Sequence, residues 1–205
     1  MSARGPHLTV WALLVAFAAP LAAASPAASP AAPPPASDPL DALMHELAAH
    51  PSGHVTFTEV QYLGVLERPL ESSGELAYQA PDRLEKRIVK PRPETLVLAH
   101  GALSATRGKI TRTMELAAWP QVAPLLESLR ATLTGDRATL ERIFSVELTG
   151  DAAHWTLELT PLDPAAARAV TRVIISGENA NLRTVEILQT DGDHSLLTIG
   201  AEVAP

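Results

Sequence analysis

The chain has 205 residues, carries 23 acidic and 16 basic side chains for a net charge of −7, and contains no cysteine. An acidic chain is repelled by phosphate groups, so its charge argues against a nucleic-acid-binding protein and against attraction to anionic membranes. Without cysteine the chain has neither a disulfide framework nor a thiol that could carry a lipid anchor, so its core must hold the fold together.

The N-terminal sequence has the pattern of an export signal. Arg4 supplies a basic start, residues 8–21 form an almost uncharged apolar run, and residues 22–24 are alanines of the size that signal peptidases accept. A membrane span is the alternative, but this run is shorter than the roughly 20 residues that a span needs, and it contains Pro20. The pattern therefore predicts a cleaved signal peptide at residues 1–24 and localisation in the periplasm.

Residues 25–37 consist only of serine, alanine and proline. Such a segment has no apolar side chains to bury at a helix or strand period, so it predicts a disordered, Ala/Pro-rich linker. Residues 38–205 then form a single domain. A domain of this length is large enough to bury roughly 70% of the surface of its unfolded chain.

The domain is predicted to open with an amphipathic helix. Asp38 is a suitable N-cap, and Pro39 suits the first helical position. Apolar side chains then recur at helical spacing, at Leu40, Leu43, Met44 and Leu47. We expect this helix, at residues 40–49, to pack across the concave face of the sheet that follows.

From residue 54 the apolar period changes to two, which is the spacing of β-strands. Residues 72–74 are predicted as a turn, and Asp191 with Gly192 between two strands is a strong hairpin signal. About eleven strands are expected, at residues 54–66, 75–80, 83–90 and 95–100, as two short strands between 101 and 115, and at residues 144–149, 154–160, 169–176, 182–190 and 195–201.

A helical segment interrupts these strands before Gly135. Its apolar residues fall on one helical face: Trp119, Val122, Leu125, Leu126 and Leu129. Residues 136–143 are predicted as a second, short helix. A strongly bent antiparallel sheet with helices over its open side is the simplest way to bury these apolar helix faces, which indicates a mainly β (α+β) fold class.

No catalytic, metal or cofactor site is predicted, and an enzyme is not expected. His45 and His50 suggest a zinc-protease helix, but histidines five residues apart are rotated by about 140° around a helix and do not hold one metal. His100, His154 and His194 stand at turns or at polar strand positions, and we expect them to be structural.

The hairpin at residues 74–84, Gly-Glu-Leu-Ala-Tyr-Gln-Ala-Pro-Asp-Arg-Leu, resembles a motif of the LolA family of periplasmic outer-membrane lipoprotein carriers. Residues 57–59 and 155–161 are similar to two further strand motifs of that family. The resemblance implies an incomplete antiparallel β-barrel of eleven strands with an N-terminal helix and a helical lid, no cofactor, and a cavity for the acyl chains of a lipoprotein. It also implies an inner-membrane exporter and an outer-membrane acceptor as partners, and we expect a monomer.

The chain departs from that family in its hairpin. Ala80 stands where typical carriers have an arginine that holds the lid shut, so we expect the lid to open more readily here. Leu84 and Lys86 replace a pair of aromatic residues. These departures favour a divergent, LolA-related subgroup with another amphiphilic cargo.

Alternation along the strands supports a groove independently of this resemblance, because each strand offers one apolar side to the interior and one polar side to water. The predicted lipid groove consists of Leu43, Leu47, Phe57, Leu76, Tyr78, Leu84, Ile88, Trp155, Leu157 and Leu159. The predicted lid is the apolar face of the helical segment, at Trp119, Val122, Leu125, Leu126 and Leu129. A closed core without a ligand is the alternative.

Lys86 shares a strand face with Leu84 and Ile88, where a lone ammonium group is costly unless it is paired or hydrated. It is predicted to contact the headgroup of an anionic lipid; alternatively it reaches the rim or pairs with a carboxylate such as Glu94. The predicted function is to carry lipoprotein acyl chains or another amphiphilic lipid toward the outer membrane. The alternative is a non-carrier envelope adaptor, and a cavity large enough for an acyl chain would separate the two.

Overall fold

The structure, a computed structural model, describes residues 38–118 and 123–203. The predicted signal peptide, the predicted linker, Trp119 and Val122 lie outside the described residues. The elements in chain order are α1 (Pro39–Ala48), β1 (Ser52–Tyr62), β2 (Leu70–Gln79), β3 (Arg83–Lys90), β4 (Glu94–Ala99), β5 (Ala102–Arg107), β6 (Ile110–Glu115), η1 (Leu116–Ala118), α2 (Ala123–Thr134), α3 (Arg137–Ile143), β7 (Phe144–Gly150), β8 (Trp155–Pro161), η2 (Ala166–Arg168), β9 (Val170–Glu178), β10 (Asn181–Gln189) and β11 (His194–Glu202).

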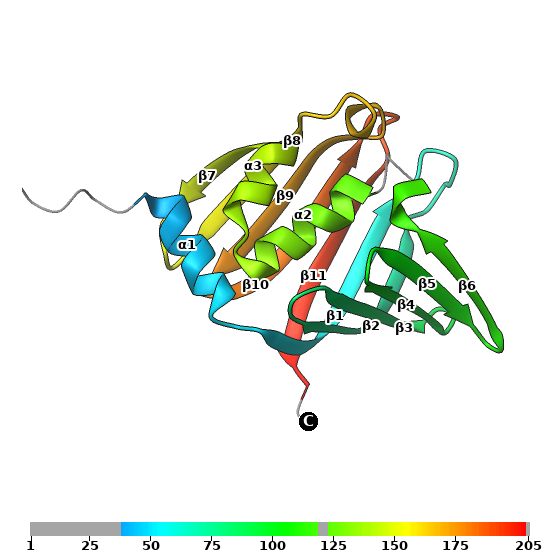
Figure 1. Cartoon of the computed structure of the whole chain (residues 1–205). Helices are drawn as coiled ribbons and strands as arrows, with labels where there is room; N and C mark the ends of the chain where they lie inside the picture. The colour runs from blue at the N-terminus through cyan, green and yellow to red at the C-terminus, as the bar shows by residue number, and fades with distance from the viewer. Residues whose placement is uncertain (1–37, 119–122, 204–205) are drawn as a thin grey trace, which may run out of the picture. The chain divides into compact units, whose positions relative to one another are not determined.

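The eleven strands form one antiparallel sheet in the order β6-β5-β4-β3-β2-β1-β11-β10-β9-β8-β7, and α1, α2 and α3 lie on one of its faces (Figure 1). β6 and β7 stand at the two ends of this order and do not pair with each other, so the sheet is not closed into a barrel. The predicted fold class, a mainly β open barrel with helices, is therefore confirmed.

The turn predicted at residues 72–74 is wrong. β2 runs unbroken from Leu70 to Gln79, and the connection from β1 lies at residues 63–69 instead. Small polar residues usually mark turns, but here they have partners inside the sheet. Ser72 Oγ donates to Glu59 Oε2 at 3.1 Å, and a Cβ on Gly74 would lie 1.9 Å from the carbonyl oxygen of Arg87 on β3.

The N-terminal helix begins as predicted, since the Asp38 carboxylate accepts a hydrogen bond from Leu40 N at 2.9 Å. Its apolar stripe is buried in the main core, together with residues from β8 and β9. That core includes Leu40, Leu43, Met44, Leu47, Leu157, Leu159, Val173 and Ile175. α1 therefore covers the inner face of the sheet at its β7–β9 end.

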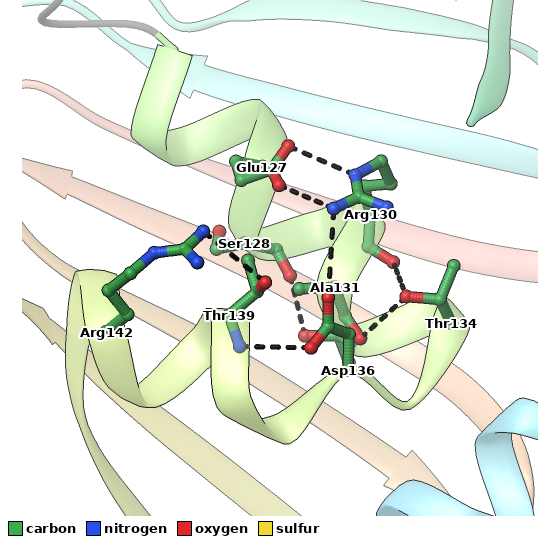
Figure 2. A network of polar contacts seen from close by, with 9 residues as sticks. Glu127, Ser128, Arg130, Ala131, Thr134, Asp136, Thr139 and Arg142 are labelled. Carbon is green, nitrogen blue, oxygen red and sulfur yellow. Dashed lines mark hydrogen bonds and ion pairs between the residues drawn. The ribbon is translucent and has the colours of Figure 1, made fainter. Parts of the chain in front are cut away.

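Charged side chains hold the junction between α2 and α3 (Figure 2). Arg130 on α2 donates to both carboxylate oxygens of Glu127 and lies 4.0 Å from Asp136. Asp136 caps α3 by accepting a hydrogen bond from Thr139 N at 3.0 Å. Hydrogen bonds from Thr139 hold the pKa of Asp136 below its usual value, so the cap stays charged in more acidic solution than an ordinary aspartate does.

α2 and α3 are also joined to α1. Arg137 Nη1 on α3 donates to Asp38 and to Asp41, at 2.7 Å in each case. Gly135 has φ +67° after the end of α2, and a Cβ there would lie 2.2 Å from the carbonyl oxygen of Met44. Glycine thus lets the end of α2 approach α1 closely, and the three helices form one connected layer.

Candidate functional site

A cavity of about 790 Å³ lies between the sheet and α2. Most of its walls are aliphatic. β2–β5 contribute Leu76, Leu84, Leu96, Leu98 and Leu103; β9–β11 contribute Val173, Ile175, Val185, Ile187, Leu197 and Ile199; and α2 contributes Leu125, Leu126, Leu129 and Leu133. Strands from both halves of the sheet border the same space, so the sheet curls around α2. The volume falls in the range of about 300–1,000 Å³ that is typical of small-molecule sites.

The structure brings only part of the predicted groove and lid to this cavity. The predicted residues that line it are Leu76, Tyr78, Leu84, Lys86, Leu125, Leu126 and Leu129. Leu43, Leu47, Trp155, Leu157 and Leu159 lie instead in the core beneath the helices, Phe57 is buried beside Lys86, and the half-buried Ile88 does not border the cavity. Alternation tells which side of a strand faces inward, but not where helices cover that side and where they leave space.

Sequence reasoning missed the part of the floor that β10 and β11 provide. Val185 and Ile187 share one face of β10, and Leu197 and Ile199 share one face of β11. Apolar residues alternate with a period of two on both strands, and this alternation could have predicted these four residues as part of the cavity wall.

The cavity opens at one end of the strands. Its exposed lining residues are His50, Ser52, Gly53, Asn181, Arg183, Gly200, Ala201 and Glu202. They come from the residues before and at the start of β1, the start of β10 and the end of β11, which lie at the same end of an antiparallel sheet. These residues therefore surround the mouth of the cavity.

An ion pair lies in the cavity wall farther from the mouth. Lys86 Nζ is 2.7 Å from Glu59 Oε2 on β1, and both residues line the cavity. The same oxygen accepts hydrogen bonds from Ser72 Oγ and Gln61 Nε2, at 3.1 Å each. Lys86 Nζ also lies 5.0 Å from the ring centroid of Phe57, in cation–π geometry. Glu59 is only 7% exposed, so the carboxylate depends on these donors for its stability.

The carboxylate that pairs with Lys86 is thus Glu59 and not Glu94, whose side chain lies 2.9 Å from Arg107 Nη2. Lys86 is therefore already paired inside the cavity wall, farther along the strands than the mouth, and its contact with a lipid headgroup stays a prediction.

A family model described as outer membrane lipoprotein carrier protein LolA-like matches residues 31–204. The chain belongs to this LolA-like family. The match takes in every described residue of the domain, and the resemblance carried by the hairpin at residues 74–84 is confirmed. Among curated proteins no match was found.

Solved structures similar to this LolA-like chain share little sequence with it. The LolA superfamily protein NE2245 from Nitrosomonas europaea is 12% identical over 82% of this chain and 94% of its own, with a TM-score of 0.44. A chain of the Pseudomonas aeruginosa MucA/MucB complex is 13% identical over 81% of this chain and 58% of its own, with a TM-score of 0.44. LprF from Mycobacterium bovis is 12% identical over 81% of this chain and 93% of its own, with a TM-score of 0.35. Similarity this low says nothing about the cargo.

One polar atom in the LolA-like cavity has no partner. Tyr78 Oη is buried and accepts or donates no hydrogen bond among residues 38–118 and 123–203. Burial raises the pKa of Tyr78 above its ordinary value, which already keeps the hydroxyl protonated at neutral pH. An unpaired buried group costs about 1–3 kcal/mol, and an ester, amide or hydroxyl of a ligand would remove that cost.

Two other kinds of site find no support in the part of the chain that the structure describes. No helix there has both the length and the apolar character to cross a bilayer. No cluster of three or more histidine, aspartate or glutamate side chains in the described ranges is placed to hold a metal ion. His45 and His50, considered above for zinc, are both exposed.

We expect Lys86→Met to lower the free energy of unfolding by about 2 kcal/mol, because it leaves the buried Glu59 carboxylate without its cation. Urea unfolding followed by circular dichroism measures this change. In a double-mutant cycle with Glu59→Gln, the double variant should lose less than the sum of the single variants. Strictly additive losses would show that the two side chains do not stabilise each other.

Proposed function

We propose that this LolA-like protein is a periplasmic carrier, which binds the acyl chains of a lipoprotein or another amphiphilic lipid and passes them toward the outer membrane. The observation that carries the proposal is the aliphatic cavity of about 790 Å³ beneath α2. A closed core would leave no such space. Export by a signal peptide at residues 1–24, an inner-membrane donor and an outer-membrane acceptor complete the proposed pathway, and no catalytic step is needed.

The energetics suit reversible binding. Each methylene group removed from water contributes about 0.8 kcal/mol. An acyl chain of about 14 carbons would therefore gain up to ~10 kcal/mol before the entropic cost of binding is subtracted. This is enough to hold a lipid in transit and little enough for an acceptor to take it.

The polar groups suggest how the cargo lies. Tyr78 pairs in register with Gly53, one of the residues that surround the mouth. Its unpartnered hydroxyl is therefore near the point where the ester or amide at the head of an acyl chain would sit. We infer that the chain enters tail first, with its head at the mouth and its tail toward the Glu59–Lys86 pair.

Native mass spectrometry of protein purified from the periplasm of the producing cell tests the proposal. We expect an added mass that disappears on extraction with organic solvent, and acylated molecules in the extract. The intact mass also reports whether residues 1–24 have been removed. Protein that carries no lipid and does not take up a fluorescent acyl probe would contradict a carrier role.

An envelope adaptor with the same fold is the second candidate. An adaptor needs a surface for a protein partner and no cargo. Recovery of lipid-free protein together with a specifically bound envelope protein would favour the adaptor over the carrier.

A further inference from the structure

All eight large hydrophobic side chains that the described residues expose lie at the end of the strands opposite the mouth. At this end β1 runs into β2, β3 into β4, β5 into β6, β8 into β9 and β10 into β11. The eight side chains are Tyr62, Val65, Leu66, Leu70, Val89, Ile110, Leu162 and Leu196. Single exposed apolar residues are normal on a protein surface, but six of these eight, all except Ile110 and Leu162, lie on the neighbouring strands β3, β2, β1 and β11 or in the connection between β1 and β2, and such a collection indicates an interaction site.

Four of them lie in the connection between β1 and β2 or on the strand residues that flank it, which we call the β1–β2 tip: Tyr62, Val65, Leu66 and Leu70. Val65 is 90% exposed, the largest fraction among the eight. The tip has a defined shape, because Gly64 N donates to Asp193 Oδ1 at 2.7 Å and Leu66 N donates to Leu63 O at 2.8 Å. The Tyr62 ring stacks on His194, with 4.4 Å between the ring centroids.

The charge next to this tip differs from that of the whole chain. The β3–β4 connection lies at the same end of the sheet as the tip; Lys90 and Arg92 stand in it or beside it, and the nearest acidic residue, Glu94, is paired with Arg107. Lys90 and Arg92 form no ion pair among the described residues, and Lys90 pairs in register with Ser73 near the start of β2. These two cations therefore flank the tip. The β1–β2 connection and the start of β2 also carry two acidic residues, Glu67 and Glu71, with Arg68 between them.

We propose that the β1–β2 tip docks on an anionic lipid bilayer, with Val65 and Leu66 entering the interface and Lys90 and Arg92 near the lipid headgroups. Apolar side chains combined with adjacent cations fit such a surface, which attracts basic groups and solvates apolar ones. The net charge of the whole chain predicts repulsion from an anionic bilayer. Lys90 and Arg92 beside the tip predict attraction at this part of the surface. Because the mouth lies at the other end of the strands, docking leaves the cavity open, and the proposal holds whether or not the cavity binds lipid.

Co-sedimentation with vesicles tests this proposal, using the chain from residue 25 on, which contains the whole compact unit Ser37–Pro205. We expect binding to vesicles of phosphatidylcholine with phosphatidylglycerol, and weaker binding to phosphatidylcholine alone. Val65→Ser with Leu66→Ser should lower the partition coefficient on the anionic vesicles at least tenfold. Lys90→Gln with Arg92→Gln should lower it about tenfold on anionic vesicles and leave the neutral ones unchanged.

Leu162→Ser is the matched control, because it removes an exposed leucine at the same end of the sheet but four strands away from β1 in the sheet order. It should bind as the unsubstituted protein does. The proposal is overturned if the unsubstituted protein does not sediment with anionic vesicles, if the tip variant binds unchanged, or if Leu162→Ser loses as much binding as the tip variant. A tip that served a protein partner would give the first of these results.

Discussion

Replacing Leu129 with aspartate is expected to weaken the binding of a fluorescent acyl probe at least tenfold, which corresponds to about 1.4 kcal/mol or more. Leu129 lies on α2 and lines the cavity, while Leu125 on the same helix also packs against the main core. A carboxylate at position 129 would face aliphatic walls. An acyl chain that entered the cavity would displace the water that hydrates this carboxylate, which costs free energy. The fold should survive, because the buried Ala131 and Thr132 still anchor α2.

The measurement is a titration of the probe by fluorescence, with thermal unfolding recorded for each variant. Leu162→Asp is the control, since it makes the same chemical change at a side chain that is 56% exposed and outside the cavity. Equal affinities for the Leu129 variant and this control would mean that the probe binds elsewhere, and the proposed cargo site would have to be abandoned.

The largest expected effect on stability comes from Gly177→Ala, at about 3 kcal/mol. A Cβ on Gly177 would lie 2.2 Å from Cζ2 of Trp155 and 2.6 Å from the carbonyl oxygen of Asn181. Trp155 has little room to move, because it is 3% exposed and its Nε1 donates to the carbonyl oxygen of Asn179 at 2.7 Å. Overpacking of a filled core typically costs about 1–3 kcal/mol, and a clash with backbone as well as side chain places this site at the upper end.

Urea unfolding gives the free energy for this variant, and near-ultraviolet circular dichroism reports on the surroundings of Trp155. Gly53→Ala is the matched glycine, since a Cβ at position 53 on β1 meets no atom within 4 Å. We expect it to change the stability by less than about 0.5 kcal/mol. Similar losses for both variants would show that the Trp155 contact is not the cause.

Local signals predicted the elements of this fold well. The Asp38 cap, the proline after it and the leucine stripe predicted α1, and the alternation at residues 83–90 gave both bounds of β3. The turn predicted at residues 72–74 failed because Ser72 and Gly74 have partners on other strands, Glu59 on β1 and Arg87 on β3. Contacts of that kind are long-range, and a local pattern of small polar residues does not contain them.

The candidate site could be predicted only in part, for a related reason. Leu76 and Leu157 occupy equivalent inward positions on strands that alternate in the same way, yet one borders the cavity and the other is fully buried in the core. The difference arises from where α1 and α3 lie on the sheet, and no strand encodes that by itself. The partner of Lys86 was missed similarly, because Glu59 is brought to it by the pairing of β1 with β2 and of β2 with β3.

The central position of the last strand has a consequence for the order of folding. β1–β6 and β7–β11 each form a meander of neighbouring strands, and within the sheet the two meanders pair only where β11 meets β1. That joint connects nearly opposite ends of the described chain, and pairings of such long range form late, after the local hairpins. A chain that is synthesised from the N-terminus would hold two incomplete half-sheets, without part of the cavity floor, until residues 194–202 had been added. Assembly of the binding compartment is therefore expected to be the final event in maturation.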